Sequence, residues 1–163
     1  MPFTADSRPN LSYLTDTEIR AEVFRRLDEQ YNHRSRFEQF ALFMGKSQLL
    51  EMVLKGLLER EYAVDSDALR RWTLGRVARE LEQRGLRQDL IALLQSVVEH
   101  RNYIAHAFLA DKAIESTLHD RERSPLTDGP LHKGMYELEQ IILIHDWCVT
   151  NDAWNRPMPT TAR

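Results

Sequence analysis

Apolar residues recur every three or four positions over most of this chain, and few glycines or prolines interrupt them. This spacing places the apolar side chains along one side of a helix. No clear run of alternating apolar and polar residues, as in a half-buried strand, stands out. The pattern therefore predicts an all-α helical bundle of about five helices. The expected helices cover about 15–31, 36–62, 65–85, 88–110 and 134–151.

Residues that cap helices set several of the expected boundaries. Thr15 or Asp16 is expected to cap the first helix, and Asp65 the third. Gly85 is expected to end the third helix, because glycine readily adopts the left-handed conformation that follows a helix.

The whole chain, 1–163, is expected to form a single domain, because 163 residues supply one core and leave little for a second. The segments 1–14 and 152–163 are expected to be flexible tails. Between about 111 and 133 the chain is polar, and Ser124-Pro125 and Asp128-Gly129-Pro130 are typical of turns. These residues predict a long loop before the last helix.

The charge of the chain limits how it can bind nucleic acid. Its 22 Lys and Arg residues against 25 Asp and Glu give a net charge of −3, so phosphate contacts must be local. Arginine makes up 18 of the 22 basic residues. A genomic base-composition bias is the first explanation for that excess, and recognition of phosphate by guanidinium groups is the second.

The single cysteine, Cys148, excludes an internal disulfide framework and a cysteine-based zinc finger. No signal peptide is recognised at the N-terminus. The richest apolar run, 49–58, is interrupted by Glu51 and Lys55 and is too short to span a membrane. We therefore expect a cytoplasmic protein without membrane contact.

Two weak motifs do not predict a cofactor or a metal. Gly45-Lys46-Ser47 resembles the end of a phosphate-binding P-loop, but Phe40 stands where that motif needs a glycine. Histidines recur every thirteen residues without a cluster of carboxylates, which is not the spacing of metal ligands. These histidines are His106, His119, His132 and His145.

The segment 99–108 conflicts with the apolar helix that surrounds it. Arg101 falls on the same side as the apolar residues at 97, 104 and 108, where a permanently charged group needs a partner or an interface. His106 lies about 140° around an unbroken helix from Arg101. A long arginine side chain, or a helix break at Asn102, would bring both groups toward one phosphate.

Arg101, Asn102 and His106 form the pattern Arg-Asn-x-x-x-His, which resembles the RX4-6H motif of HEPN domains. In that family a polar residue usually follows the arginine. Chain size, the all-α bundle and the position of the motif before a final helix are also similar. A second match, from Arg26 to His33, has no polar residue after its arginine and is set aside.

The resemblance implies a metal-independent endoribonuclease of the toxin or phage-defence type, with a cleft between two protomers and an antitoxin protein as a partner. Its chemistry is attack of a ribose 2′-OH on phosphorus, with His106 as acid or base and Arg101 binding the phosphate oxygens. Asn102 would orient the backbone or the phosphate. The supporting residues would be Glu99, His100 and Tyr103.

One position departs from part of the family. Members that are paired with a nucleotidyltransferase antitoxin carry a modified tyrosine two residues after the motif histidine, and Phe108 stands there. Control by tyrosine modification is therefore not expected at this site.

Two other interpretations remain open. The chain can be a non-catalytic HEPN-like bundle that binds RNA or a protein, or a plain helical interaction module in which the motif is a coincidence. In the plain module Arg101 would pair with a glutamate inside the bundle, and His106 would donate to a backbone carbonyl. The enzyme needs both side chains at a shared, solvent-accessible cleft.

Overall fold

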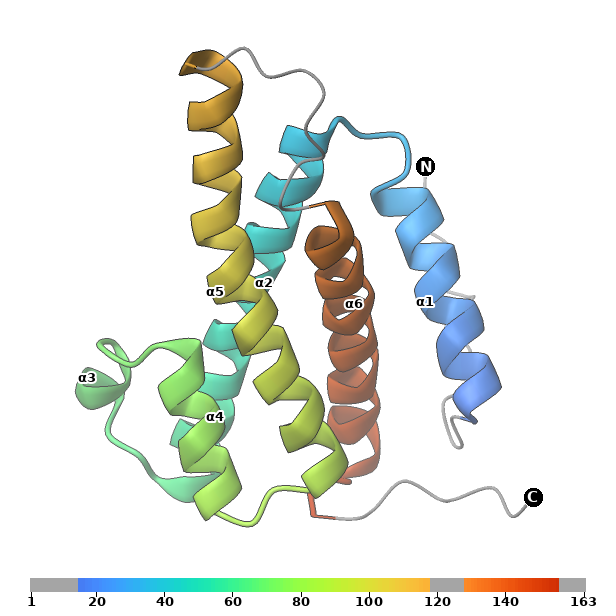
Figure 1. Ribbon diagram of the computed structural model, residues 1–163. Coiled ribbons are helices and arrows are strands. Elements are labelled where there is room, and N and C mark those ends of the chain that lie inside the picture. Colours follow the sequence, from blue (N-terminus) through green and yellow to red (C-terminus); the bar gives the residue numbers. More distant parts are fainter. Residues whose placement is uncertain (1–14, 118–127, 156–163) are drawn as a thin grey trace, which may run out of the picture.

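The computed structural model describes residues 15–117 and 128–155. The regular secondary structure in these two ranges is entirely helical, as Figure 1 shows. The predicted all-α class is therefore confirmed. The described ranges form six helices, one more than the pattern predicts.

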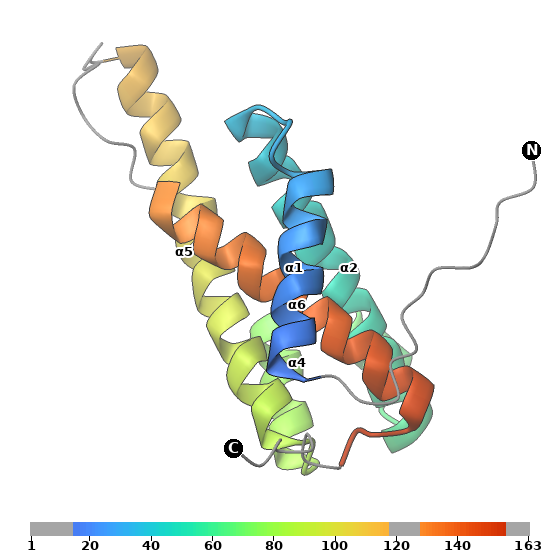
Figure 2. The same cartoon turned by 90° about the vertical axis from the view of Figure 1, so that its right-hand side faces the viewer.

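The last helix lies in the middle of the bundle. In Figures 1 and 2, α6 (Asp128–Asn151) runs between α1 (Asp16–Gln30) and α5 (Gln88–Thr117), and it also packs on α2 (Arg36–Tyr62). The shorter α4 (Leu74–Gln83) packs on α2 and α5. The central helix thus contacts the three other long helices.

The first two long helices begin at the residues that their sequences predict. Thr15 caps α1, with its hydroxyl accepting from the Glu18 amide and the Glu18 carboxylate accepting from the Thr15 amide. Ser35 caps α2 in the same reciprocal way with Glu38. The predicted inward side of α1 is buried: Ile19, Val23, Leu27 and Tyr31.

The third predicted helix is two helices. Asp65 caps the single turn α3 (Ser66–Leu69) as expected, but the chain then leaves the helix. The Thr73 hydroxyl accepts from the amide of Arg76 and starts α4 as a separate helix. Gly85, with φ of 79°, follows the end of α4, which confirms the predicted stop.

The long polar loop before the last helix is shorter than expected. Helix α5 continues to Thr117, and α6 begins at Asp128, so Asp128-Gly129-Pro130 form the first turn of a helix. A proline is tolerated there because the first-turn amides have no partner within the helix. Ser124-Pro125 lies outside the described residues.

The chain stays packed beyond the residue where its tail was expected to begin. Ala153 and Trp154 are only 1% and 9% exposed. The Arg87 amide donates to the Trp154 carbonyl at 2.9 Å, and its guanidinium donates to the Ala153 carbonyl at 3.2 Å. The rest of that segment, and residues 1–14, lie outside the described residues.

Helices α5 and α6 approach closely because a glycine lies between them. A Cβ on Gly134 would come within 2.9 Å of Ile104 Cδ1 and 3.2 Å of the Phe43 ring. The predicted inward side of α5 is buried: Leu90, Leu94, Val97, Ile104 and Phe108. Within the described ranges, no helix has the length and apolarity needed to cross a membrane.

Candidate functional site

Helix α5 carries the whole segment 99–108 without a break. A helix break at Asn102 is therefore absent, and Arg101 and His106 keep their separation of about 140° around one axis. The course of the backbone therefore does not itself bring the two groups together within a single chain. This geometry removes a helix break as a way for one protomer to bring both groups to one phosphate.

Arg101 lies on the packed side of α5. Its neighbours on that side, Val97, Ile104 and Phe108, are at most 2% exposed, and Arg101 itself is half-buried. Its Nε atom is buried and has no hydrogen-bond partner among the described residues. A buried polar atom without a partner costs about 1–3 kcal/mol, and more in a charged group. The ion pair with a glutamate that the plain module predicts is absent from the described part of the chain.

His106 lies on the exposed flank of the same helix. Asn102 and Glu99 are also exposed on this flank, and Tyr103 is 48% exposed. Within residues 15–117 and 128–155, the His106 imidazole donates to no backbone carbonyl. The carbonyl contact that the plain module predicts for His106 is therefore absent among these residues.

His100, which is an expected supporting residue, contacts the neighbouring helix α6. Its Nδ1 lies 2.8 Å from the Ser96 carbonyl oxygen and 3.0 Å from Glu137 Oε2 on α6. The Ser96 hydroxyl donates to the same carboxylate oxygen at 2.8 Å. Sequence spacing could not reveal this contact, because it depends on how α5 and α6 pack.

Phe108, where the HEPN resemblance would place a modified tyrosine in some members, is a buried ring. Phe108 is 2% exposed and stacks on Phe40, with ring centroids 3.9 Å apart and planes 5° apart. The ring at this position therefore packs in the aromatic cluster of α2 and α5, and phenylalanine has no hydroxyl to modify.

A second polar cluster, which the sequence analysis missed, surrounds Glu139 between α1, α2 and α6. Glu139 is 1% exposed, and Tyr31 donates to its carboxylate at 3.0 Å. Lys46 forms an ion pair with it, and Arg26 lies 3.7 Å away. A sign of this cluster is present in the sequence, since Glu139 falls on the apolar side of its helix, as Arg101 does on its own.

This cluster accounts for the lysine of the rejected P-loop pattern. Lys46 lies inside α2, and its ammonium group donates to Gln30 and Glu139. Burial and the nearby Glu139 carboxylate raise the pKa of Tyr31 well above its usual range, so its hydroxyl stays a donor. Arg26 also pairs with Glu22 at 3.0 Å, so two cations face two carboxylates, as in a structural ion-pair network.

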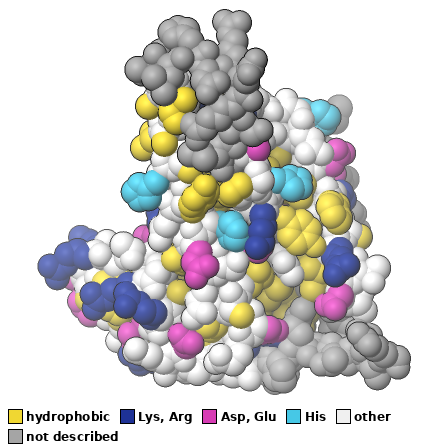
Figure 3. All heavy atoms as spheres, in the orientation of Figure 1, with side chains coloured by type: hydrophobic (Ala, Val, Ile, Leu, Met, Phe, Trp, Pro, Cys, Tyr) yellow, Lys and Arg dark blue, Asp and Glu magenta, His cyan; other side chains and the backbone are white. Residues whose placement is uncertain are grey.

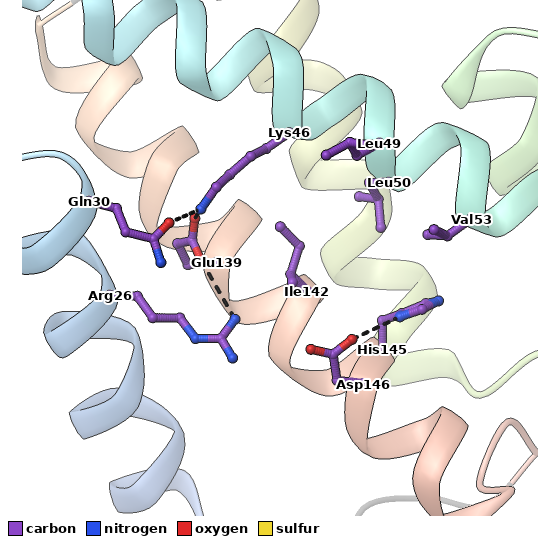
Figure 4. A pocket seen from close by; sticks show the side chains of 10 residues that line it. All are labelled: Arg26, Gln30, Lys46, Leu49, Leu50, Val53, Glu139, Ile142, His145 and Asp146. Atoms are coloured by element: carbon purple, nitrogen blue, oxygen red, sulfur yellow. Dashed lines mark hydrogen bonds and ion pairs between the residues drawn. The ribbon is translucent and has the colours of Figure 1, made fainter. Parts of the chain in front are cut away.

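A cavity of about 250 Å³ opens beside this network. Figure 4 shows Arg26, Lys46 and Glu139 at one end and His145 and Asp146, 3.4 Å apart, at the other. The apolar part of the wall consists of Leu49, Leu50, Val53 and Ile142. The two cations at the polar end are paired with Glu139 and Glu22, so this end of the cavity is an ion-pair network.

Metal-ligating groups do not gather in the described part of the chain. Among these residues there is no group of three or more His, Cys, Asp or Glu that could hold a metal ion. Figure 3 shows histidine side chains spread over one face of the molecule.

Comparison of the chain with protein-family models, with curated proteins and with solved structures finds no match.

Proposed function

We propose that this chain is a metal-independent endoribonuclease whose site forms across a homodimer. The observation that carries the proposal is the half-buried Arg101 guanidinium, whose buried Nε has no partner among the described residues. A fixed cation beside a packed core, with no counter-ion among the described residues, is suited to bind an anion. A phosphodiester is the anion that the Arg-Asn-x-x-x-His pattern favours.

The reaction needs two proton transfers and one cation. A base takes the proton of the ribose 2′-OH, and O2′ forms a bond to the adjacent phosphorus. The bond between phosphorus and O5′ then breaks, and an acid gives a proton to the departing O5′. Arg101 binds the non-bridging oxygens as negative charge develops on them. The products are a 2′,3′-cyclic phosphate and a free 5′-hydroxyl, so no metal ion and no water molecule is consumed.

The arrangement of α5 supports a site shared by two copies. His106 lies about 140° around the helix and about 7.5 Å along it from Arg101. A second copy that packs against this region can place its own His106 opposite the first Arg101, as two-fold symmetry allows. The HEPN resemblance adds a toxin or phage-defence role in the cytoplasm and an antitoxin protein as the binding partner to seek.

The test is cleavage of RNA in the presence of a chelator. We expect fragments that end in 2′,3′-cyclic phosphate, and we expect His106→Ala to abolish them while the fold remains intact by circular dichroism. His132→Ala, which removes another exposed imidazole, is the matched control and should cleave normally. Cleavage that survives His106→Ala would overturn the proposal. Light scattering that finds only monomer at micromolar concentration would count against the shared site.

One observation favours the non-catalytic alternative, a bundle that binds RNA or protein. Within one chain Arg101 and His106 start about 140° apart around α5, and a binding surface does not require them to meet. The two functions differ in one measurement: the binding module retains RNA in a filter-binding experiment but leaves it uncut over hours.

A further inference from the structure

The contacts of His100 fix its protonation pattern. Its Nδ1 faces two groups that only accept hydrogen bonds, the Ser96 carbonyl at 2.8 Å and the Glu137 carboxylate at 3.0 Å. The ring hydrogen of the neutral imidazole must therefore be on Nδ1. The lone pair is then on Nε2, which is the nitrogen that can accept a proton.

The basic nitrogen of His100 remains accessible. The side chain is 18% exposed. Among the described residues Nε2 has no hydrogen-bond partner. The atom is not fully buried, so solvent can reach it. An imidazole with Nδ1–H beside a carboxylate and a free Nε2 is the arrangement by which enzymes orient a general base and stabilise its imidazolium form.

This cluster is not a serine nucleophile site. Ser96 donates its hydroxyl hydrogen to Glu137 at 2.8 Å and lies beside Nδ1 at 3.5 Å, on the far side of the ring from Nε2. A nucleophilic serine would have to face the basic nitrogen. The cluster instead has the arrangement of a proton-transfer histidine and a carboxylate that positions it.

We propose that His100 is the general base of the cleavage reaction, with Glu137 as its positioning residue and His106 of the partner subunit as the acid. This inference rests on the proposed function. His100 directly precedes Arg101, so the two groups lie on adjoining sides of α5, about 100° apart and about 1.5 Å along the axis. They are much closer neighbours than Arg101 and His106.

The proton balance of this step is complete. Nε2 of His100 takes the 2′-OH proton, and the new imidazolium is stabilised by Glu137, whose other oxygen lies 3.8 Å from Lys133. His106 of the partner subunit enters the step protonated and gives its proton to O5′. Exchange with solvent then restores both histidines. Each site thus combines Arg101 and His100 of one protomer with one histidine of the other.

This division of residues predicts which mixtures of inactive subunits recover activity. Subunits with His100→Ala and subunits with His106→Ala, refolded together, leave one intact site in each mixed dimer. Random pairing makes about half the dimers mixed, and each mixed dimer has one of its two sites intact. We therefore expect about a quarter of the wild-type rate. Arg101→Ala mixed with His106→Ala should recover the same fraction. Arg101→Ala mixed with His100→Ala should recover nothing, because both losses fall on the same half of each site.

The single variants test the chemistry. His100→Ala and His100→Asn, whose amide can still donate to the Ser96 carbonyl, should each lower kcat by about 100-fold or more. Glu137→Gln should lower kcat less and move the acidic limb of the pH–rate profile toward lower pH, because the charge that stabilises the imidazolium is gone. Lys133→Met, which removes the other charge near this carboxylate, should move the limb the opposite way. If the role of Glu137 were purely structural, Glu137→Gln would lower the unfolding free energy and leave the pH–rate profile unchanged.

Independent evidence comes from nuclear magnetic resonance of 15N-labelled histidines in the wild-type protein. We expect the neutral His100 ring to be protonated at Nδ1, and the opposite tautomer would overturn the inference. A His100→Ala variant that cleaves at the wild-type rate, while His106→Ala does not cleave, would also overturn it and leave the proposed function standing. Wild-type protein that does not cut RNA would overturn both.

Discussion

The Tyr31 hydroxyl donates to the buried Glu139 carboxylate at 3.0 Å, although 108 positions separate the two residues. The bond joins α1 to the central α6. Because Lys46 of α2 pairs with the same carboxylate, one buried group connects three helices. We expect this cluster to contribute to the stability of the bundle.

Replacement of Tyr31 by phenylalanine tests that contribution. The variant keeps the ring and leaves the charged carboxylate with one donor fewer, so we expect the unfolding free energy to fall by about 1.5–3 kcal/mol. Urea denaturation followed by circular dichroism measures the change. Tyr62→Phe is the control, because the Tyr62 hydroxyl has no hydrogen-bond partner among the described residues, and its effect should stay within about 0.5 kcal/mol. Equal effects of the two variants would show that the Glu139 cluster contributes little.

Two glycine-to-alanine variants test the packing of α5 on α6. In Gly134→Ala the new methyl group would lie 2.9 Å from Ile104 Cδ1 and 3.2 Å from the Phe43 ring, so we expect a loss of about 1–3 kcal/mol. In Gly45→Ala the methyl group meets nothing within 4 Å. That variant should gain about 0.5–1 kcal/mol from helix propensity alone. Thermal unfolding of both variants gives the signs, and a stabilised Gly134→Ala would contradict the close approach of the two helices.

Acid should remove the stabilisation that Glu22 provides. Hydrogen bonds from Arg25, with a smaller contribution from Arg26, lower the pKa of Glu22 to about 2, although partial burial acts in the opposite direction. A lowered pKa means that the stabilisation is present above the unfolded-state value of about 4.3 and is lost as the pH falls toward 2. We expect the difference in unfolding free energy between the wild type and Glu22→Gln to shrink by about 1–2 kcal/mol between pH 5 and pH 2. A difference that stays constant over this range would show that Glu22 is not held by these cations in solution.

Local patterns in the sequence predicted the parts of the fold that depend on neighbouring residues. The cap at Thr15 and the stop at Gly85 follow from residue types that are close in the chain. The inward positions of α5 follow from periodicity in the same way. Thr73 was missed because the apolar period continues across it from Leu69 to Val77, while its hydroxyl starts a new helix.

The candidate site was predictable to a smaller extent. An arginine on an apolar stripe indicated an unusual group at Arg101, and the structure places that group against the core. The pairing of His100 with Glu137 depends on the packing of α5 and α6, and no spacing within one helix encodes it. The same reason explains why the Glu139 cluster was missed, since its members come from three helices.

The uninterrupted course of α5 makes the expected activity depend on the concentration of the protein. A hinge between Arg101 and His106 would let one molecule assemble its own site, but a continuous helix from Gln88 to Thr117 offers none. Under the proposed function, catalysis then requires an encounter of two molecules. When the protein is scarce, the concentration of the active dimer would rise with the square of the protein concentration. A modest change in synthesis would then decide whether the RNA of the cell is degraded.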